Sequence, residues 1–188
     1  MSNKKLFIIS GPSGAGEDSI IKGLRELLNI NVPTTTTTRK MREGESEGRP
    51  YYFISKESFK KGVLENKFFE WTKQDNENLY GVTHVEIDDV RSKEGVGILK
   101  VDYNGVITAK KLLGDDVIAI LINCPLNQIA ERLKKRDNAS EEFVSRRLKY
   151  AKGWLENKDV FDYEVINDDG NLEKSVAIVY DIIQKNTK

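Results

Sequence analysis

The sequence is poor in several residue types that build common kinds of site. It holds one cysteine, one histidine, two methionines and four prolines among 188 residues. A single cysteine, Cys124, excludes an internal disulfide, and we expect it to be a small core residue at a strand end in a reducing compartment. The lone histidine, His84, is expected at the surface, at the start of a helix.

Net charge is absent as well. Thirty basic and thirty acidic residues cancel, so no global charge steers the chain to nucleic acid or to an anionic membrane. No apolar run reaches the roughly 18 residues of a membrane span, and the run after the first five residues is too short for a signal peptide. We therefore expect a cytoplasmic protein with no nucleic-acid or membrane partner, while the oligomeric state stays unknown.

The most informative absence is a lysine. Residues 11–19 follow the apolar run Leu6–Ile9 and precede a helical pattern, which is the context of a phosphate-binding loop. Such a loop, G-x-x-x-x-G-K-[ST], cradles phosphates with backbone N–H groups and a lysine. Here Glu17 replaces the lysine and Asp18 the hydroxyl residue. The expected donor-phosphate contacts are Gly11, Ser13, Gly14, Ala15, Gly16, Glu17, Asp18 and Ser19.

Strand-like and helix-like segments alternate along most of the chain. This pattern predicts an α/β fold with a parallel sheet covered by helices, and the length suits one domain with an inserted lobe. The expected strands are Leu6–Ser10, Val96–Asp102, Val117–Asn123 and Tyr163–Asn167. The expected helices are Ser19–Leu28, Val106–Leu113, Leu126–Lys135, Glu141–Lys158 and Leu172–Gln184.

The stretch 34–83 interrupts this alternation. It opens with five consecutive threonines and is rich in aromatic residues, a composition that favours a small, mostly β insertion. We interpret the threonine run as an edge strand. The insertion also carries the segment T-T-R-K-M-R-E-G-E at 37–45, in which Arg39 and Arg42 are spaced to converge on one phosphate with planar forks of donors.

This segment, with the downstream Tyr51-Tyr52-Phe53, Phe69-Glu70-Trp71 and Leu79-Tyr80-Gly81, resembles guanylate kinase. The resemblance runs from Leu6 to the final helix and implies GMP and ATP as small-molecule substrates. It implies that Glu70 accepts hydrogen bonds from N1–H and the 2-amino group of guanine, a pattern that adenine lacks. The implied GMP-binding residues are Thr35, Arg39, Arg42, Glu45, Tyr51, Glu70, Tyr80 and Asp102.

The resemblance further implies a P-loop NTPase-type core over residues 1–33 and 84–188, a GMP-binding insertion over 34–83, and an arginine-bearing lid at about 134–147. The expected reaction moves the γ-phosphate of ATP to GMP, with Mg²⁺ accompanying ATP. Arg132, Arg136 and Arg147 match the catalytic arginines of the family. Asn167 matches a position near the adenine.

A second departure complements the missing lysine. The family pattern L-D-x-D is here Leu99-Lys100-Val101-Asp102, so an aspartate is replaced by a lysine. Strand alternation would put Lys100 and Asp102 on one face. An uncompensated glutamate about 4 Å from a phosphate charge costs roughly 4 kcal/mol at an effective dielectric near 20. We hypothesise that Lys100 reaches Glu17 or the β-phosphate and thereby acts as the catalytic cation.

Several alternatives stay open. Asp18 either binds Mg²⁺ in place of the hydroxyl or stabilises the helix N-terminus while occupying the anion site. Val82 replaces a Ser or Thr of the family, Asn104 a Gln and Asp137 a Gly, and Val82 alone leaves room for a kinase of another nucleoside monophosphate. The main alternative is a catalytically weak or inactive guanylate-kinase-like module that binds a nucleotide or a peptide.

Overall fold

The computed structural model describes residues 4–73, 77–137 and 140–187, with side chains at 136 and 137 outside the description. Its central sheet has five parallel strands in the order β10-β9-β1-β8-β2. The bounds are β1 Leu6–Ser10, β2 Ile30–Asn31, β8 Val96–Leu99, β9 Val117–Asn123 and β10 Tyr163–Ile166. The prediction of a parallel α/β sheet is confirmed, and only the short edge strand β2 was missed.

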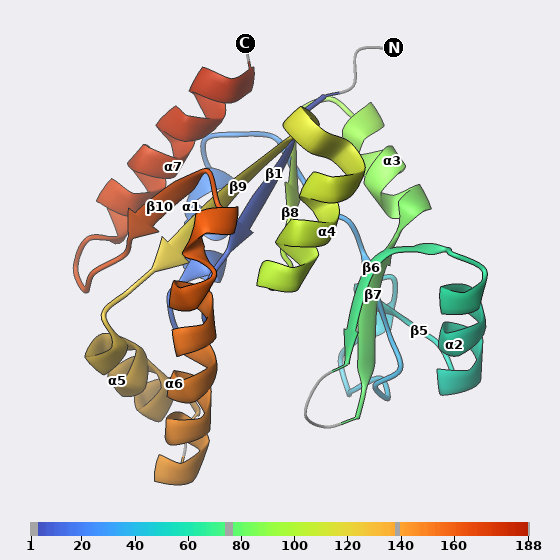
Figure 1. Cartoon of the computed structure of the whole chain (residues 1–188), viewed down its shortest axis with the longest axis horizontal. Coiled ribbons are helices and arrows are strands. Elements are labelled where there is room, and N and C mark those ends of the chain that lie inside the picture. Colours follow the sequence, from blue (N-terminus) through green and yellow to red (C-terminus); the bar gives the residue numbers. More distant parts are fainter. Residues whose placement is uncertain (1–3, 74–76, 138–139, 188) are drawn as a thin grey trace.

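Both faces of this sheet are covered by helices (Figure 1). Side chains alternate along β1, so Phe7 and Ile9 join one buried cluster whereas Leu6 and Ile8 join the other. Helices α1 (Glu17–Leu24) and α7 (Leu172–Thr187) contribute to the first cluster. Helices α3 (His84–Ser92) and α4 (Tyr103–Leu113) cover the second. Cys124 follows β9 and is buried in the first cluster, as expected.

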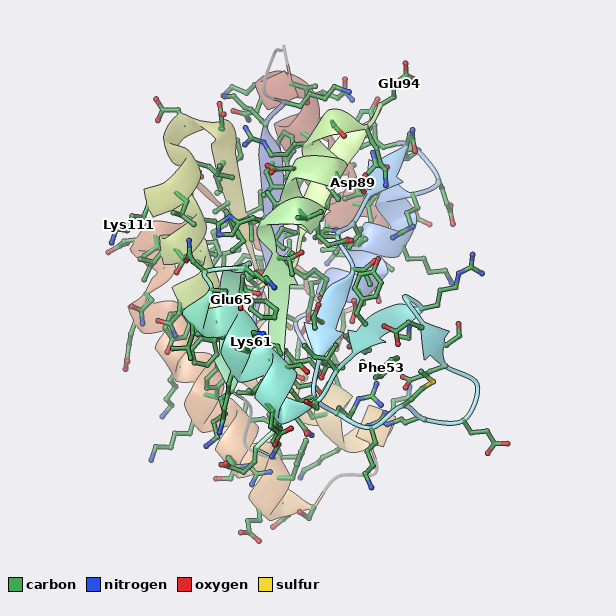
Figure 2. All side chains as sticks on the ribbon, turned by 90° about the vertical axis from the view of Figure 1, so that its right-hand side faces the viewer. Phe53, Lys61, Glu65, Asp89, Glu94 and Lys111 are labelled. Carbon is green, nitrogen blue, oxygen red and sulfur yellow. The ribbon has the colours of Figure 1, made fainter. Side chains whose placement is uncertain are left out.

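The insertion folds as a second sheet in the order β4-β5-β3-β7-β6. Its strands are β3 Thr35–Thr37, β4 Ser46–Glu47, β5 Pro50–Phe53, β6 Phe68–Lys73 and β7 Leu79–Thr83. One helix, α2 (Lys56–Leu64), packs Phe59 against this sheet. Figure 2 looks onto α2 from outside and shows Lys61 on its outer side, with Glu65 directly after the helix. The mostly β insertion is therefore present, with one helix that the composition did not indicate.

The interpretation of the threonine run as an edge strand was wrong. Strand β3 lies inside its sheet, parallel to β5 on one side and antiparallel to β7 on the other. Thr36 and Thr37 are buried, and the Thr37 hydroxyl donates to the Leu79 carbonyl at 3.1 Å. A threonine can occupy an inner strand when its hydroxyl finds a partner of this kind.

Two helices extend beyond the carboxyl ends of the central strands, on the same side of the molecule as the insertion (Figure 1). They are α5 (Leu126–Asp137) and α6 (Glu141–Glu156). The predicted lid, about 134–147, spans the end of α5 and the start of α6, and its residues 138 and 139 lie outside the described residues. Short 3₁₀ turns at Gly114–Asp116 and Lys158–Val160 complete the described structure. The parallel strands thus direct the loops after β1, β8 and β9 toward one edge.

Local capping explains where several boundaries differ from the predicted ones. Strand β8 ends at Leu99 rather than Asp102, because the Asp102 carboxylate accepts from Gly105 N at 3.0 Å and begins α4 three residues earlier than predicted. His84 begins α3 as expected. It is only half exposed, however, with its ring edge-on to Phe69 at 5.7 Å between centroids.

Gly11 provides a test of how closely the phosphate-loop segment packs on β9. A Cβ atom at Gly11 would lie 2.1 Å from the Ile122 carbonyl oxygen, which is backbone and cannot move aside. We expect Gly11→Ala to lower the melting temperature by roughly 3–10 °C, as overpacking of a rigid site does. Gly153→Ala in α6 is the control, because its Cβ meets Tyr103 Oη at an ordinary 3.6 Å. Equal melting temperatures for the two variants would contradict the packing.

Candidate active site

The loop between β1 and α1 has the backbone form of an anion site. Gly14 and Gly16 adopt left-handed φ angles of 97° and 98°, and Gly16 directly precedes the first turn of α1. The N-terminus of a helix presents unpaired N–H groups and a partial positive charge to an anion. Glu17 and Asp18 both lie in that first turn, so two carboxylates stand where phosphate charge is expected.

A polar network behind this loop fixes its shape. The Asn167 amide donates to the Ala15 carbonyl at 2.8 Å and lies 2.3 Å from the place of a Cβ on Gly16. The Arg132 guanidinium donates to Gly14 O at 3.2 Å and to Ala15 O at 3.3 Å. It also binds Asn167 O at 2.8 Å and the Asp169 carboxylate at 2.6 Å. Arg132 therefore holds the loop in this structure, and its catalytic role stays a prediction, as does contact of Asn167 with adenine.

Lys100 lies beside the loop, and its partner there is Asp18. The Lys100 ammonium donates to Asp18 Oδ1. The proximity of the segment after β8 to the loop is confirmed, because β8 pairs with β1. The expectation that strand alternation puts Lys100 and Asp102 on one face was wrong, since both residues follow the strand rather than lying in it.

The ion pair between Lys100 and Asp18 is easily opened. The Asp18 side chain is 79% exposed and that of Lys100 38%. Pairs this exposed contribute about 0–1 kcal/mol, because water screens them and two flexible side chains must be ordered. Lys100 can therefore exchange its carboxylate partner for a phosphate at little cost.

A serine that the motif analysis passed over holds this segment in place. Ser10 ends β1, is buried, and its hydroxyl both accepts from Val101 N at 3.1 Å and donates to the Val101 carbonyl. Val101 lies between Lys100 and Asp102. The sequence signal for Ser10 was a polar residue that ends the apolar run directly before Gly11.

The first arginine of the insertion is oriented by a carboxylate. Arg39 makes a two-pronged contact with Glu45, with N···O distances of 2.7 and 3.0 Å, and lies over the Tyr51 ring at 5.3 Å. Glu45 also accepts from Arg42 N at 2.7 Å. The bond from Arg39 lowers the pKa of Glu45 below its ordinary value. Arg42 itself is exposed.

Two tyrosines and a threonine complete this part of the insertion. Tyr51 pairs with Thr35 across β5 and β3, and its ring meets Tyr80 edge-on at 5.9 Å. Thr35, Arg39, Glu45, Tyr51 and Tyr80 thus gather at one place, which we call the arginine cluster. This grouping follows the sequence prediction; contact with GMP stays a prediction.

Glu70 lies in a separate pocket between β6 and α4, with a volume of about 380 Å³. Asp102 and Asn104 line the same pocket. Burial, followed by the negative charge of Asp102, raises the pKa of Glu70 to about 8. A carboxyl group with a pKa this far from its ordinary value, inside a pocket, is typical of a functional site.

The remaining predicted positions lie in different parts of the structure. Val82 is buried in the core cluster with Phe69, which accounts for an apolar residue there. Arg147 on α6 lies over the Phe143 ring at 5.2 Å. Arg136 belongs to α5, but its side chain and that of Asp137 lie outside the described residues. Across the described residues, no three His, Cys, Asp or Glu side chains form a metal-binding group.

These features define an α/β protein of the phosphate-loop class with a β insertion that carries the arginine cluster. Comparisons with known proteins narrow the class. The family model for guanylate kinase matches residues 3–186, nearly the whole chain. The chain belongs to the guanylate kinase family.

Individual relatives agree with this assignment. A guanylate kinase of Thermotoga maritima is 35% identical over 181 residues, covering 96% of this chain and 86% of that protein. One of Fusobacterium nucleatum is 30% identical over 188 residues, the full length of both. A crystal structure of guanylate kinase from Anaplasma phagocytophilum superposes with a TM-score of 0.72 at 26% identity, covering 99% of this chain and 87% of that one. No described helix is long and apolar enough to cross a bilayer.

The raised pKa of Glu70 predicts how stability depends on pH. The folded protein holds this proton more tightly than the unfolded chain, whose ordinary pKa is 4.5. Folding is therefore favoured by Glu70 below about pH 4.5, and this contribution is lost as pH rises through about 8. The Glu70→Gln variant has no ionisable group at this position and does not lose this contribution. We therefore expect its free energy of unfolding near pH 9 to exceed that of the parent by on the order of 2 kcal/mol.

Denaturant unfolding at about pH 4 and about pH 9 measures this difference. Glu26→Gln is the control, because Glu26 is an exposed carboxyl on the surface. A constant difference between Glu70→Gln and the parent across this range would show that Glu70 is not a buried, proton-holding carboxyl.

Proposed function

We propose that this protein transfers the γ-phosphate of ATP to GMP, giving ADP and GDP, with Lys100 replacing the missing loop lysine. The observation that carries the acceptor assignment is the Glu70 pocket. It joins a buried carboxyl from the insertion to Asp102 from the core. Membership of the guanylate kinase family supports the same reaction.

Glu70 supplies base selection in this proposal. A carboxylate accepts from both N1–H and the 2-amino group of guanine, whereas adenine presents an acceptor at N1 and no 2-amino group. Guanine therefore satisfies the ionised carboxylate with two donors, which the N1 edge of adenine does not offer. Since the pKa of Glu70 is about 8 without ligand, GMP binding at neutral pH releases a proton.

The arginine cluster supplies the phosphate site. Arg39 is held by Glu45 in a fixed fork, and Arg42 is exposed for a second contact. Planar forks bind phosphate oxygens in pairs. A fixed acceptor phosphate places its oxygen for in-line attack on the γ-phosphorus, and positioning of this kind is the main source of catalysis in phosphoryl transfer.

Lys100 supplies the cation on the donor side. Its ammonium already lies at the first turn of α1, where it contacts Asp18. Donor phosphates bound by the loop compete with Asp18 for this ammonium, and the exposed pair opens at little cost. Arg136 and Arg147, carried by α5 and α6, would add charge when the proposed lid closes over the transferred group.

Mg²⁺ with ATP fits the residues present. Mg²⁺ in such sites is held by one or two carboxylates together with substrate phosphates, not by a complete protein cage. Asp18 is an exposed carboxylate at the loop, and it is the residue that would hold the ion. When bound there, Mg²⁺ would supply positive charge against the β- and γ-phosphates. A cytoplasmic location is part of the same proposal.

The alternative is a non-catalytic module that binds GMP or a peptide. One observation favours it, since Asp18 neutralises the lysine that would serve the donor. The two functions differ in a simple measurement, because the module needs no donor and releases no ADP.

A coupled assay of ADP formation from ATP, with and without GMP and Mg²⁺, tests the proposed function. We expect GMP-dependent ADP formation that stops in excess chelator and is weak with AMP. Lys100→Ala should lower kcat by roughly 100-fold or more, as removal of a transition-state cation does. Lys110→Ala is the matched control, since Lys110 pairs with Asp162 at 2.7 Å, next to β10 rather than at the loop.

Two outcomes would contradict the proposal. GMP binding by calorimetry without any ADP formation would support the module. ADP formation that Lys100→Ala leaves unchanged would retain the kinase activity but remove Lys100 from the mechanism.

A further inference from the structure

Helix α6 contacts Asp102, a residue that lines the Glu70 pocket, through a tyrosine that no motif indicated. Tyr150 lies on α6, and its hydroxyl donates to Asp102 Oδ2 at 3.4 Å. The other carboxylate oxygen of Asp102 caps α4 by accepting from Gly105 N at 3.0 Å. Asp102 therefore joins three parts of the molecule, namely the start of α4, helix α6 and the pocket that holds Glu70.

Core packing does not explain Tyr150. Its side chain is 45% exposed, so a buried aromatic contact is not its main contribution. Its hydroxyl end nevertheless points at a carboxylate, and burial together with the charge of Asp102 raises the pKa of Tyr150 to about 12. The hydroxyl thus stays protonated and acts as a donor throughout the neutral range.

The ring of Tyr150 belongs to a junction between α6 and α4. It lies 6.4 Å from the Tyr103 ring, which in turn meets Trp154 edge-on at 5.6 Å. Arg147, one turn before Tyr150, lies close enough for its charge to act on the phenol. The charged and titratable groups around the hydroxyl are accordingly Asp102, Tyr103 and Arg147, with Glu70 beyond Asp102.

We propose that Tyr150 is a positioning residue for the acceptor pocket, holding the Asp102 carboxylate from helix α6 so that purine binding depends on the placement of that helix. The inference rests on the proposed function, because it assigns the pocket to the acceptor base. A separation of 3.4 Å is long for an O–H···O bond. Contacts at functional sites are often long without ligand and shorten when the ligand is bound.

The experiment compares Tyr150→Phe with Tyr103→Phe in steady-state kinetics. The first variant keeps the ring and removes the hydroxyl that contacts Asp102. The second removes a hydroxyl from the same aromatic junction. We expect Tyr150→Phe to raise the KM for GMP roughly three- to tenfold, the range of an ordinary net hydrogen bond, because this contact is long and partly exposed to water. The KM for ATP and kcat should change less than twofold, and the melting temperature should change by less than about 2 °C. The Tyr103→Phe variant should match the parent in all of these measurements.

A double-mutant cycle with Asp102→Asn shows whether the effect passes through Asp102. If it does, adding Tyr150→Phe to Asp102→Asn raises the KM for GMP by less than twofold further, because the contact is already altered. If instead the two substitutions raise the KM for GMP by independent factors that multiply in the double variant, the assignment of Tyr150 as a positioning residue is overturned. A Tyr150→Phe variant with parental KM for GMP, or one that only loses melting temperature, would overturn it as well.

Calorimetry of GMP binding separates this inference from the proposed function. If the parent binds GMP without turnover, the kinase proposal fails, and the ratio of Kd values for Tyr150→Phe and the parent decides the role of Tyr150. If the parent turns over GMP but Tyr150→Phe is unchanged in KM and Kd, only the inference fails. A parent that neither binds nor phosphorylates GMP overturns both.

Discussion

The hydroxyl of Ser10 exchanges two hydrogen bonds with the backbone of Val101. This contact ties the end of β1, where the phosphate loop begins, to the segment that follows β8. Lys100 on one side of Val101 consequently lies at the loop, and Asp102 on the other side lies in the pocket of Glu70. One buried residue, whose hydrogen bonds are satisfied within the fold, thereby fixes the proposed donor side of the site relative to the proposed acceptor side.

The positive charge at the loop is moved to a new position. Relative to the family pattern, a lysine has become Glu17 and an aspartate has become Lys100, so these two changes cancel, while Asp18 in place of the hydroxyl residue adds one negative charge. The position of the cation is what changes, from the start of α1 to the segment beside it. In a mechanism that depends on where positive charge lies relative to the phosphates, such a relocation is compatible with catalysis provided that the new lysine reaches them.

Much of the fold could be predicted because its signals are local. Strands β1 and β9 follow from short apolar runs, and their bounds agree with the structure. The end of β8 was missed because a cap by Asp102 competes with continued strand pairing, and apolar patterning carries no information about that competition. The threonine strand was wrongly expected at the edge of its sheet because both of its neighbours are separated from it along the chain. A loop and β4 lie between it and β5, and β7 is farther away in sequence.

The candidate site, like the fold, could be predicted from the sequence only in part. The roles of the arginines, the tyrosines and Glu70 were predicted from the resemblance to the family motifs, and their contacts with GMP stay predictions. The contact of Lys100 with Asp18 instead of Glu17, the role of Ser10 and the contact of Tyr150 with Asp102 depend on tertiary distances. Each joins residues 48 or more positions apart, and a single sequence gives no indication of such pairs.

The proposed mechanism depends on Lys100 replacing the loop lysine. Returning the positive charge to position 17 is the most direct test. The turnover number for GMP phosphorylation is measured for Lys100→Asp alone and for Lys100→Asp combined with Glu17→Lys. The account predicts a loss of roughly 100-fold or more for the single variant and recovery to within about tenfold of the parent for the double variant, since the cation is restored at the phosphates. A single variant with parental turnover, or a double variant as inactive as the single one, would contradict it.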